Sequence, residues 1–536
     1  MEFILIFILP FVGALLLLVV IHEFGHFATA RAMGVKVLEF GVGFPPRAFG
    51  FYTGKTLVMV DSATRFVNID GVAGLRTGQL VKVSSAEDQD GNLVARVVEA
   101  PKPRRGWASR LPGRGGEGEK EESVPVEYLK HEGKVRAVES GHFVLADMLY
   151  SVNWAPLGGF VRLAGESDPR VPRSLASKGV ATRFLVLVAG PFMNAIFPIV
   201  VFTVLFMIPQ DVVVGQVVVS RITAGTPAEE AGLLPGDIIL QAGGRLIENQ
   251  NDLRRATNLN GNSNMEWLVV RDGREVVVLV HPRFEQPKGQ WRAGILISEI
   301  AGQVTVSQVF DGTPAEEAGL QPDDVIAEAG GRGITNTGDL IEAIAFNEDA
   351  AMPWVIIREG RQQPITVTPR FEQERSRQWI TGESTVLIDS HAESRSEPPW
   401  TAVASGFAST WELLVMIKQA LAGAFDAGEV PELSGPIGIA QVTGEITRDG
   451  GLTGWLVITV LLSINLAILN ILPLPMLDGG RLVFVMLEWV RRGKRVPPEK
   501  EGLVHLIGFV VLIGAVLVIS ANDINRLIQG NSFLGG

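Results

Sequence analysis

The stretch Ile21-His22-Glu23-Phe24-Gly25-His26 follows an uncharged apolar run from Phe3 to Val20. On a helix, residues four apart lie on one face, so the imidazoles of His22 and His26 can bind one zinc ion. Glu23 stands beside them and can take a proton from zinc-bound water. A chance match is the alternative. The apolar surroundings favour a metal site, because ionisable groups at membrane depth are costly and are usually functional.

The composition indicates a membrane protein with soluble parts. Hydrophobic residues make up 47% of the 536 positions, which is high for a fully soluble chain. The formal net charge of −11 argues against a nucleic-acid-binding surface, and no nucleic-acid partner is expected. Cysteine is absent, which excludes disulfides and thiolate ligands and leaves histidine and carboxylate as zinc ligands.

The first predicted membrane helix covers residues 1–35. We expect it to be retained, because its start lacks the basic residues of a signal peptide. In residues 36–50, the run Gly41-Val42-Gly43-Phe44-Pro45-Pro46 cannot continue a helix and predicts a bent or extended segment. Residues 151–182 contain a second glycine-interrupted apolar stretch, Pro156 to Leu163. Such backbone at membrane depth has to be covered by protein.

Between these segments, residues 51–150 are expected to form a small β-rich domain. Runs such as Leu80-Val81-Lys82-Val83 read as short strands. Within this domain, residues 101–123 are rich in Pro, Gly and charged side chains and predict a flexible loop. A basic nucleic-acid arm is the alternative interpretation of this stretch, and the sequence assigns no function to the domain.

The second predicted membrane helix covers residues 183–209. It contains Ala189-Gly190-Pro191-Phe192-Met193-Asn194, in which small residues allow another helix to approach closely. A buried Asn194 needs a hydrogen-bonding partner. It either joins two helices, or it orients the site or contacts substrate.

The middle of the chain contains a repeat. The sequence Gly-Thr-Pro-Ala-Glu-Glu-Ala-Gly-Leu occurs at residues 225–233 and again, unchanged, at 312–320. It predicts two small domains, 212–298 and 299–375, that look like tandem PDZ domains, whose strand edge beside a helix accepts an extended peptide. Asp323 replaces Gly236 in the second copy, which we expect to alter the turn. The two domains either bind peptides or act as a spacer or entry filter.

The C-terminal part is expected to hold two further membrane helices. Residues 376–450 predict a connector with an amphipathic helix that lies against the membrane. The third membrane helix and the motif after it occupy 452–490, where Asp478 is the only acid near this hydrophobic depth. Asp478 is the natural third metal ligand, and capping of the following helix is its alternative role. A basic loop (491–501), a fourth membrane helix (502–521) and a tail (522–536) complete the chain.

The charge distribution predicts the orientation in the membrane. The 491–501 loop and the 51–182 region are rich in Arg and Lys, so both are expected to be cytoplasmic. The predicted fold is a polytopic α-helical membrane protein with about four transmembrane helices, two extracytoplasmic α/β PDZ-like domains and a small β-rich cytoplasmic insertion. His505 is interpreted as a boundary or packing residue. The remaining histidines are interpreted as ordinary: His131, His142, His281 and His391.

With these residues assembled, the chain resembles the site-2 protease family of intramembrane zinc metalloproteases, in its bacterial branch with tandem PDZ domains. The resemblance rests on the His22 to His26 motif, on Ala189 through Asn194, and on Asn470 through Gly479. It implies one zinc ion per chain with Glu23 as the catalytic base. The residues that it implies as metal ligands are His22, His26 and Asp478, and those near the substrate are Asn194, Asn470, Pro473 and Pro475.

The resemblance also implies that residues 41–44 and 156–161 form a membrane-embedded β element that presents the substrate. The roughly 100 residues between them are a departure, because the family usually has a short connection there. This insertion could regulate access, recruit a cytoplasmic partner or be neutral.

The expected reaction is peptide-bond hydrolysis within the transmembrane segment of a single-pass protein in the inner (cytoplasmic) membrane. The implied substrate is a membrane protein already shortened outside the cytoplasm, such as an anti-sigma factor, and leftover signal peptides are a second class. The PDZ pair would exclude bulky ectodomains. Two other interpretations remain: a PDZ-based membrane scaffold would need the repeat without the metal motif, and a metal transporter would need no glutamate placed as a base.

Overall fold

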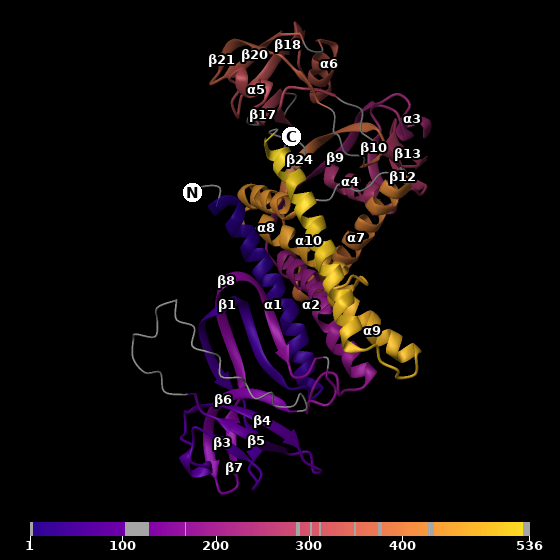
Figure 1. Ribbon diagram of the computed structural model, residues 1–536. Coiled ribbons are helices and arrows are strands. Elements are labelled where there is room, and N and C mark those ends of the chain that lie inside the picture. Colours follow the sequence, from indigo (N-terminus) through magenta and orange to yellow (C-terminus); the bar gives the residue numbers. More distant parts are fainter. Residues whose placement is uncertain are drawn as a thin grey trace. The chain divides into compact units, whose positions relative to one another are not determined.

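The computed structural model describes residues 4–101, 128–166, 168–285, 290–300, 303–309, 312–347, 350–372, 378–426, 428 and 434–528. The predicted flexible loop at 101–123 lies almost wholly outside these residues. The chain divides into two compact units, Met1–Val201 with Ser434–Leu534, and Phe202–Leu433. Each unit is described by itself (Figure 1).

Long apolar helices dominate the first unit. Five described helices in the whole chain are long and apolar enough to cross a membrane, against about four predicted, and the additional one is α7 (Pro399–Asp426), which the sequence placed against the membrane surface. It has the lowest mean hydropathy of the five. The helices of the first unit are η1 (Ile4–Ile8), α1 (Leu9–Ala32), α2 (Val180–Met207), α8 (Pro436–Ile471), α9 (Asp478–Val490) and α10 (Pro498–Ile528).

Two of these helices begin or end away from their predicted bounds. The third membrane helix was expected from residue 452, but α8 begins at Pro436 and continues across a kink at Gly451, whose φ of 55° is outside the helical region. Glycine tolerates this angle because it has no Cβ. The tail expected from 522 is helical up to Ile528, because α10 continues through it.

The two glycine-rich segments pair with each other. The strands β1 (Val37–Thr53) and β8 (Met148–Leu163) form an antiparallel two-stranded sheet in which Gly41 pairs with Phe160. A Cβ atom on Gly41 would lie 2.5 Å from the Phe160 ring, so only glycine allows this register. The sheet lies beside α1 (Figure 1), and β8 packs against that helix.

The insertion forms a β domain whose sheet closes on itself, because β2 pairs with both β7 and β5. Alternating inward residues such as Val81, Val83, Phe143 and Leu145 fill its core. Its strands are β2 (Thr56–Met59), β3 (Arg65–Val67), β4 (Leu80–Glu87), β5 (Leu93–Glu99), β6 (Leu129–Glu139) and β7 (His142–Ala146), with a short 3-10 helix η2 (Val72–Gly74).

The second unit contains the two repeats. Each is built on one antiparallel sheet, one short helix and one longer helix. Trp267 and Trp354 occupy equivalent core positions. The first repeat contains β9 (Gln210–Ile222), α3 (Pro227–Glu230), β10 (Ile238–Ala242), β11 (Arg245–Leu246), α4 (Gln250–Leu259), β12 (Met265–Arg271), β13 (Arg274–Val280), β14 (Arg283–Glu285), β23 (Gln378–Ile380) and β24 (Glu383–Arg395).

The second repeat is nested inside the first. It contains β15 (Gln290–Arg292), β16 (Ile295–Ile300), β17 (Gln303–Val309), α5 (Pro314–Glu317), β18 (Val325–Ala329), β19 (Arg332–Gly333), α6 (Thr337–Asn347), β20 (Met352–Arg358), β21 (Arg361–Val367) and β22 (Arg370–Glu372). The sheet orders are β13-β12-β10-β9-β24 and β21-β20-β18-β17-β16.

The structure therefore differs from the predicted boundary at 298. The first sheet takes its edge strand β24 from the predicted connector, whereas β15 and β16 belong to the second repeat. We expected one repeat to end before the other begins. The duplicated motif shows that there are two repeats, but it gives no information on which strand completes each sheet. The expected change of turn at Asp323 is also wrong: its φ of 70° is left-handed like that of Gly236, at 94°, and aspartate tolerates this region.

Candidate metal centre

Helix α1 places His22 and His26 on one face, as their spacing requires. Both imidazoles are buried, and their Nε2 atoms lie 3.2 Å apart. Neighbouring α2 packs closely on this face. A Cβ atom on Gly190 would lie 2.3 Å from His26 Nε2, so glycine leaves the space in front of the imidazoles open.

Asp478 meets the two histidines from the start of α9. Its Oδ2 atom lies 2.9 Å from His22 Nε2 and 3.1 Å from His26 Nε2, although 456 residues separate Asp478 from His22. The N-cap of α9 is Leu477 and makes no side-chain cap hydrogen bond. Asp478 is therefore not the N-cap residue of α9, and its carboxylate oxygen lies against the two imidazoles instead.

The three ligand atoms fit a single zinc ion. They lie within 4.8 Å of one another and are two imidazole nitrogens and one carboxylate oxygen, a donor set that zinc accepts. Ligand atoms about 2.05 Å from a tetrahedral ion are about 3.3 Å apart, close to the separations seen here. Three converging lone pairs repel each other unless a cation or proton lies between them.

Hydrogen bonds behind the imidazoles fix their orientation. His26 Nδ1 donates to the Val186 carbonyl oxygen at 2.7 Å, which directs the Nε2 lone pair toward the centre. The Asn194 amide lies 3.3 Å from His22 Nδ1, and Asn194 Oδ1 is buried without a partner among the described residues. Exchanging the amide oxygen and nitrogen would let Oδ1 accept the His22 Nδ1 proton and satisfy both groups.

A pocket of about 250 Å³ adjoins two of the three ligands, His26 and Asp478. Glu23 lines it beside His26 and Asp478, and the carboxylate of Glu23 is held by the backbone N–H of Val161 on β8. The remaining lining comes from β8, the segment between β8 and α2, α2, and the region after α8: Phe160, Val161, Leu163, Glu166, Leu175, Val186, Leu187, Met476 and Arg481. A reacting group in this pocket would face both Glu23 and the metal ligands.

Comparison with known proteins gives the family. The model of peptidase family M50 matches residues 10–76 and 134–515, which is most of the chain. The chain belongs to peptidase family M50. The gap in the match, 77–133, falls within the insertion of this M50 peptidase.

Similar curated proteins are named as proteases. Zinc metalloprotease RasP of Oceanobacillus iheyensis is 28% identical over 95% of this chain and 96% of its own length. Regulator of sigma-W protease RasP of Bacillus subtilis is 26% identical over 95% and 96%. Regulator of sigma-E protease RseP of Escherichia coli is 28% identical and covers 70% of this chain and 87% of its own length.

The M50 peptidase brings some predicted site residues together and leaves others apart. His22, Glu23, His26, Asp478 and Asn194 meet at one place. Asn470 is buried near the end of α8, and Pro473 is exposed in the following loop; neither lines the described pocket. Pro475 lies in the same loop and packs against Gly508 of α10.

Two residues near the site were not predicted to belong to it. Arg481, one helical turn after Asp478, lines the pocket and pairs with Glu166 at 2.9 Å. In the sequence, its position three residues after Asp478 was the feature that could have indicated that it lies near the site. His505, interpreted as a packing residue, accepts the Met476 N–H at 2.8 Å through Nδ1 and so holds the loop that leads to Asp478.

Proposed function

We propose that this M50 peptidase is a zinc-dependent endopeptidase that cleaves transmembrane segments of single-pass membrane proteins. The observation that supports it most is the convergence of His22, His26 and Asp478 beside Glu23, with both histidines on α1, a helix long and apolar enough to cross a membrane. The family match makes a scaffold or transporter role a poorer account of the same residues. We assign one zinc ion per chain to the three ligands.

The residues of the site have separate roles in this proposal. Zinc, when bound, acts as a Lewis acid toward water and the scissile carbonyl. Glu23 takes the proton from the attacking water and returns it to the leaving amine. Val186 and Asn194 hold the imidazoles, and Gly190 keeps the approach open. Asn470, Pro473 and Pro475 are proposed to lie along the substrate path.

The β1–β8 sheet is a suitable element for presenting substrate. A transmembrane helix satisfies its own carbonyls, so the scissile segment has to unwind before hydrolysis. Phe160 and Val161 on β8 line the pocket beside Glu23, and in the described residues β8 pairs with β1 alone. An unwound substrate added along β8 would pass directly over Glu23.

The names of the relatives indicate a substrate class. Two of them are regulators of sigma-W and sigma-E, so we propose a shortened, membrane-anchored anti-sigma factor as the substrate and signal-peptide remnants as a second class. The PDZ-like repeats would face the extracytoplasmic side of the inner membrane and exclude bulky ectodomains. The insertion (51–150), the 151–182 segment and the 491–501 loop would be cytoplasmic.

Reconstitution tests the proposal. The full chain and its Glu23→Gln variant would be placed in liposomes with a substrate that contains one transmembrane segment. We expect wild type to cleave it and the variant to be slower by roughly 10² to 10⁴-fold, because a general base contributes about that much. Zinc content should be equal in both. Equal cleavage by both proteins, or none by zinc-loaded wild type on several substrates, would exclude a protease.

A further inference from the structure

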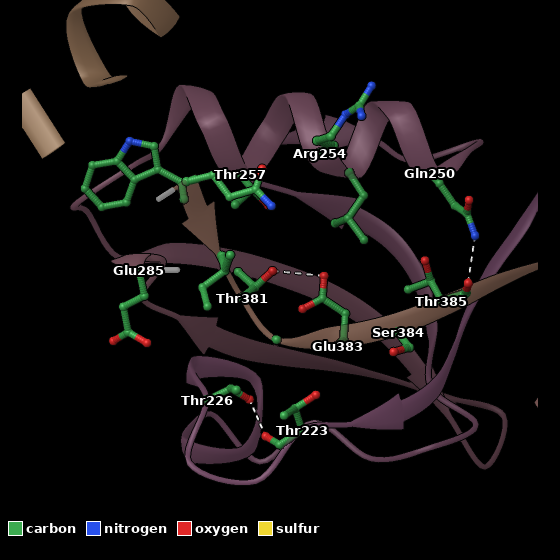
Figure 2. A pocket seen from close by; sticks show the side chains of 15 residues that line it. Thr223, Thr226, Gln250, Arg254, Thr257, Glu285, Thr381, Glu383, Ser384 and Thr385 are labelled. Atoms are coloured by element: carbon green, nitrogen blue, oxygen red, sulfur yellow. Dashed lines mark hydrogen bonds between the residues drawn. The ribbon is translucent and has the colours of Figure 1, made fainter. Parts of the chain in front are cut away.

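A second pocket, of about 290 Å³, lies in the first PDZ-like repeat between helix α4 and strand β24. Figure 2 shows α4 along one side and Glu383 of β24 directed toward it, with Thr381 and Thr257 nearby. Most of its lining side chains are polar: Thr223, Thr226, Gln250, Arg254, Thr257, Glu285, Gln378, Thr381, Glu383, Ser384 and Thr385. The metal centre contributes no residue to this pocket.

The Glu383 carboxyl group is buried but incompletely paired. Its Oε1 atom accepts the Thr381 hydroxyl at 2.9 Å, and its own backbone N–H also donates to the carboxyl group. Oε2 is buried and has no hydrogen-bond partner among the described residues. Burial raises the pKa of Glu383 to about 7. An unsatisfied buried carboxylate oxygen is costly, so a donor that reached it would be held well.

The second repeat shows that the fold does not require this carboxylate. Gly382 and Gly294 are equivalent, since both have positive φ and a Cβ on either would lie 2.2 Å from a threonine Cβ. The residue after each glycine is Glu383 in the first repeat and Ile295 in the second. Ile295 packs against the apolar core of its repeat. The same position can therefore hold an ordinary apolar side chain.

A second difference between the repeats accompanies the first. Thr257 on α4 occupies the place of Ile344 on α6, and both side chains are buried. Leu253 and Leu340, one turn earlier, are the same in both repeats. Where the helix faces the strand, the first repeat therefore has two polar side chains, Thr257 and Glu383. The second repeat has two apolar side chains, Ile344 and Ile295, at the same positions.

The groove has an open strand edge. Among the described residues, β24 is the last strand in the order β13-β12-β10-β9-β24, and no further strand pairs with its outer edge, which an extended peptide can therefore join. The exposed Gln250 side chain donates to the Thr385 carbonyl at 2.7 Å and would rotate away when a peptide backbone replaces it. The loop before β24 is firmly held, since the Thr381 and Gly382 carbonyls accept backbone N–H groups from Ala228 and Thr223.

The charges around Glu383 decide which peptide fits. Arg254 on α4 points away from Glu383 in Figure 2, and Glu285 is a second acid in the lining. We propose that this groove binds an extended peptide segment by inserting a Lys or Arg side chain toward Glu383, and that it disfavours a free peptide C-terminus. A terminal carboxylate would meet the Glu383 carboxylate, whereas an ammonium or guanidinium group would pair with the free Oε2.

Peptide binding to the full-length protein tests this assignment independently of cleavage. The probe is a fluorescein-labelled, amidated heptapeptide of alternating Thr and Val with Lys at its centre, and its match has norleucine instead. Fluorescence anisotropy is measured at pH 8 on detergent-solubilised protein carrying Glu23→Gln, which prevents turnover. We expect the Lys peptide to bind about tenfold tighter or more, the range expected for one charge-assisted hydrogen bond.

Three variants and a change of terminus define the outcome. Glu383→Gln keeps the shape and Glu383→Ile copies the second repeat; either should remove the Lys preference. Glu285→Gln removes a different acid from the same pocket and should leave the preference within about twofold. The free-acid form of the Lys peptide should bind more weakly than the amide. Absence of binding, equal binding of both probes, or equal effects of the Glu285 and Glu383 variants would overturn the proposal.

Discussion

Two clusters in the first unit each combine histidine with aspartate, and they differ in what completes them. The metal centre, formed by His22, His26 and Asp478, directs three lone-pair-bearing atoms at one point. The insertion cluster is formed by Lys36, Thr56, Ser85, His131 and Asp147. There, Asp147 Oδ2 lies 2.6 Å from His131 Nδ1, and Lys36 Nζ donates to Oδ1 at 2.7 Å.

The insertion cluster supplies all of its own partners. Thr56 also donates to Asp147 Oδ1 at 2.7 Å, and Ser85 Oγ lies 2.9 Å from His131 Nε2. Serine, histidine and aspartate in this order have the composition of a hydrolase triad, but Ser85 is 0% exposed, so no substrate reaches it. Lys36 provides the positive charge that the metal centre has to obtain from a bound ion. The two clusters therefore differ less in residue type than in whether the protein itself supplies hydrogen-bond donors and a positive charge to the carboxylate. Among the described residues, the structural cluster has them, and the metal site does not.

The largest expected effect follows from exchanging one carboxylate in the metal centre. Asp478→Asn should abolish hydrolysis and weaken zinc binding by more than roughly 100-fold, since changes to the groups behind metal ligands already cost about 10 to 100-fold. Zinc content and chelator competition measure this. Asp147→Asn is the matched control and should keep its zinc. Unchanged affinity in Asp478→Asn would remove Asp478 from the ligand set.

The same exchange in the insertion cluster should affect stability instead. Asp147→Asn leaves the Lys36 ammonium buried without a counter-charge, which costs about 3–5 kcal/mol. Hydrogen exchange of β6 and β7 in the full-length protein measures the loss. Adding Lys36→Met should recover part of it, because the uncompensated charge is then removed. If the double variant is no more stable than Asp147→Asn, the Lys36–Asp147 pair does not carry the stability.

Local sequence pattern was sufficient for residues whose chemistry conflicts with their surroundings. His22, His26 and Asp478 stand out because each is polar within an apolar stretch, and the structure brings them together. His131 was interpreted as ordinary, although it occupies an inward position of the alternating strand β6. Its partner Ser85 lies in β4 and its partner Asp147 lies between β7 and β8, and a single strand pattern does not identify them.

Long-range strand pairing was the part that the sequence could not predict. The identical motifs at 225–233 and 312–320 indicated two similar domains, but the pairing of β24 with β9 joins residues more than 150 positions apart. Nothing in the composition of residues 383–395 distinguishes a connector strand from a sheet edge. For the same reason the groove containing Glu383 could not be anticipated, since it exists only once β24 is in place.

A smaller effect on the metal centre is expected from the group behind His22. Asn194→Leu removes the amide that faces His22 Nδ1 and should lower zinc affinity about 10 to 100-fold while leaving the three ligands present. Chelator competition measures it. Ser463→Ala serves as the control, because Ser463 donates to the Asn194 backbone carbonyl at 2.7 Å and not to the amide side chain. Equal effects of the two variants would indicate a packing role for Asn194.

The smallest effect is the pH dependence of the insertion cluster. Hydrogen bonds from His131 and Lys36 and the charge of Lys36 outweigh burial and lower the pKa of Asp147 to about 2. The unfolded value is about 3.9, so this stabilisation is complete above about pH 4 and is lost as the pH falls through about 2. It amounts to about 2.6 kcal/mol, because the two pKa values differ by about 1.9 units and each unit corresponds to about 1.4 kcal/mol. Exchange of β6 and β7 amides, corrected for intrinsic rates between pH 2 and 5, should show this loss in wild type and not in Asp147→Asn. The same loss in both would assign it to other carboxylates.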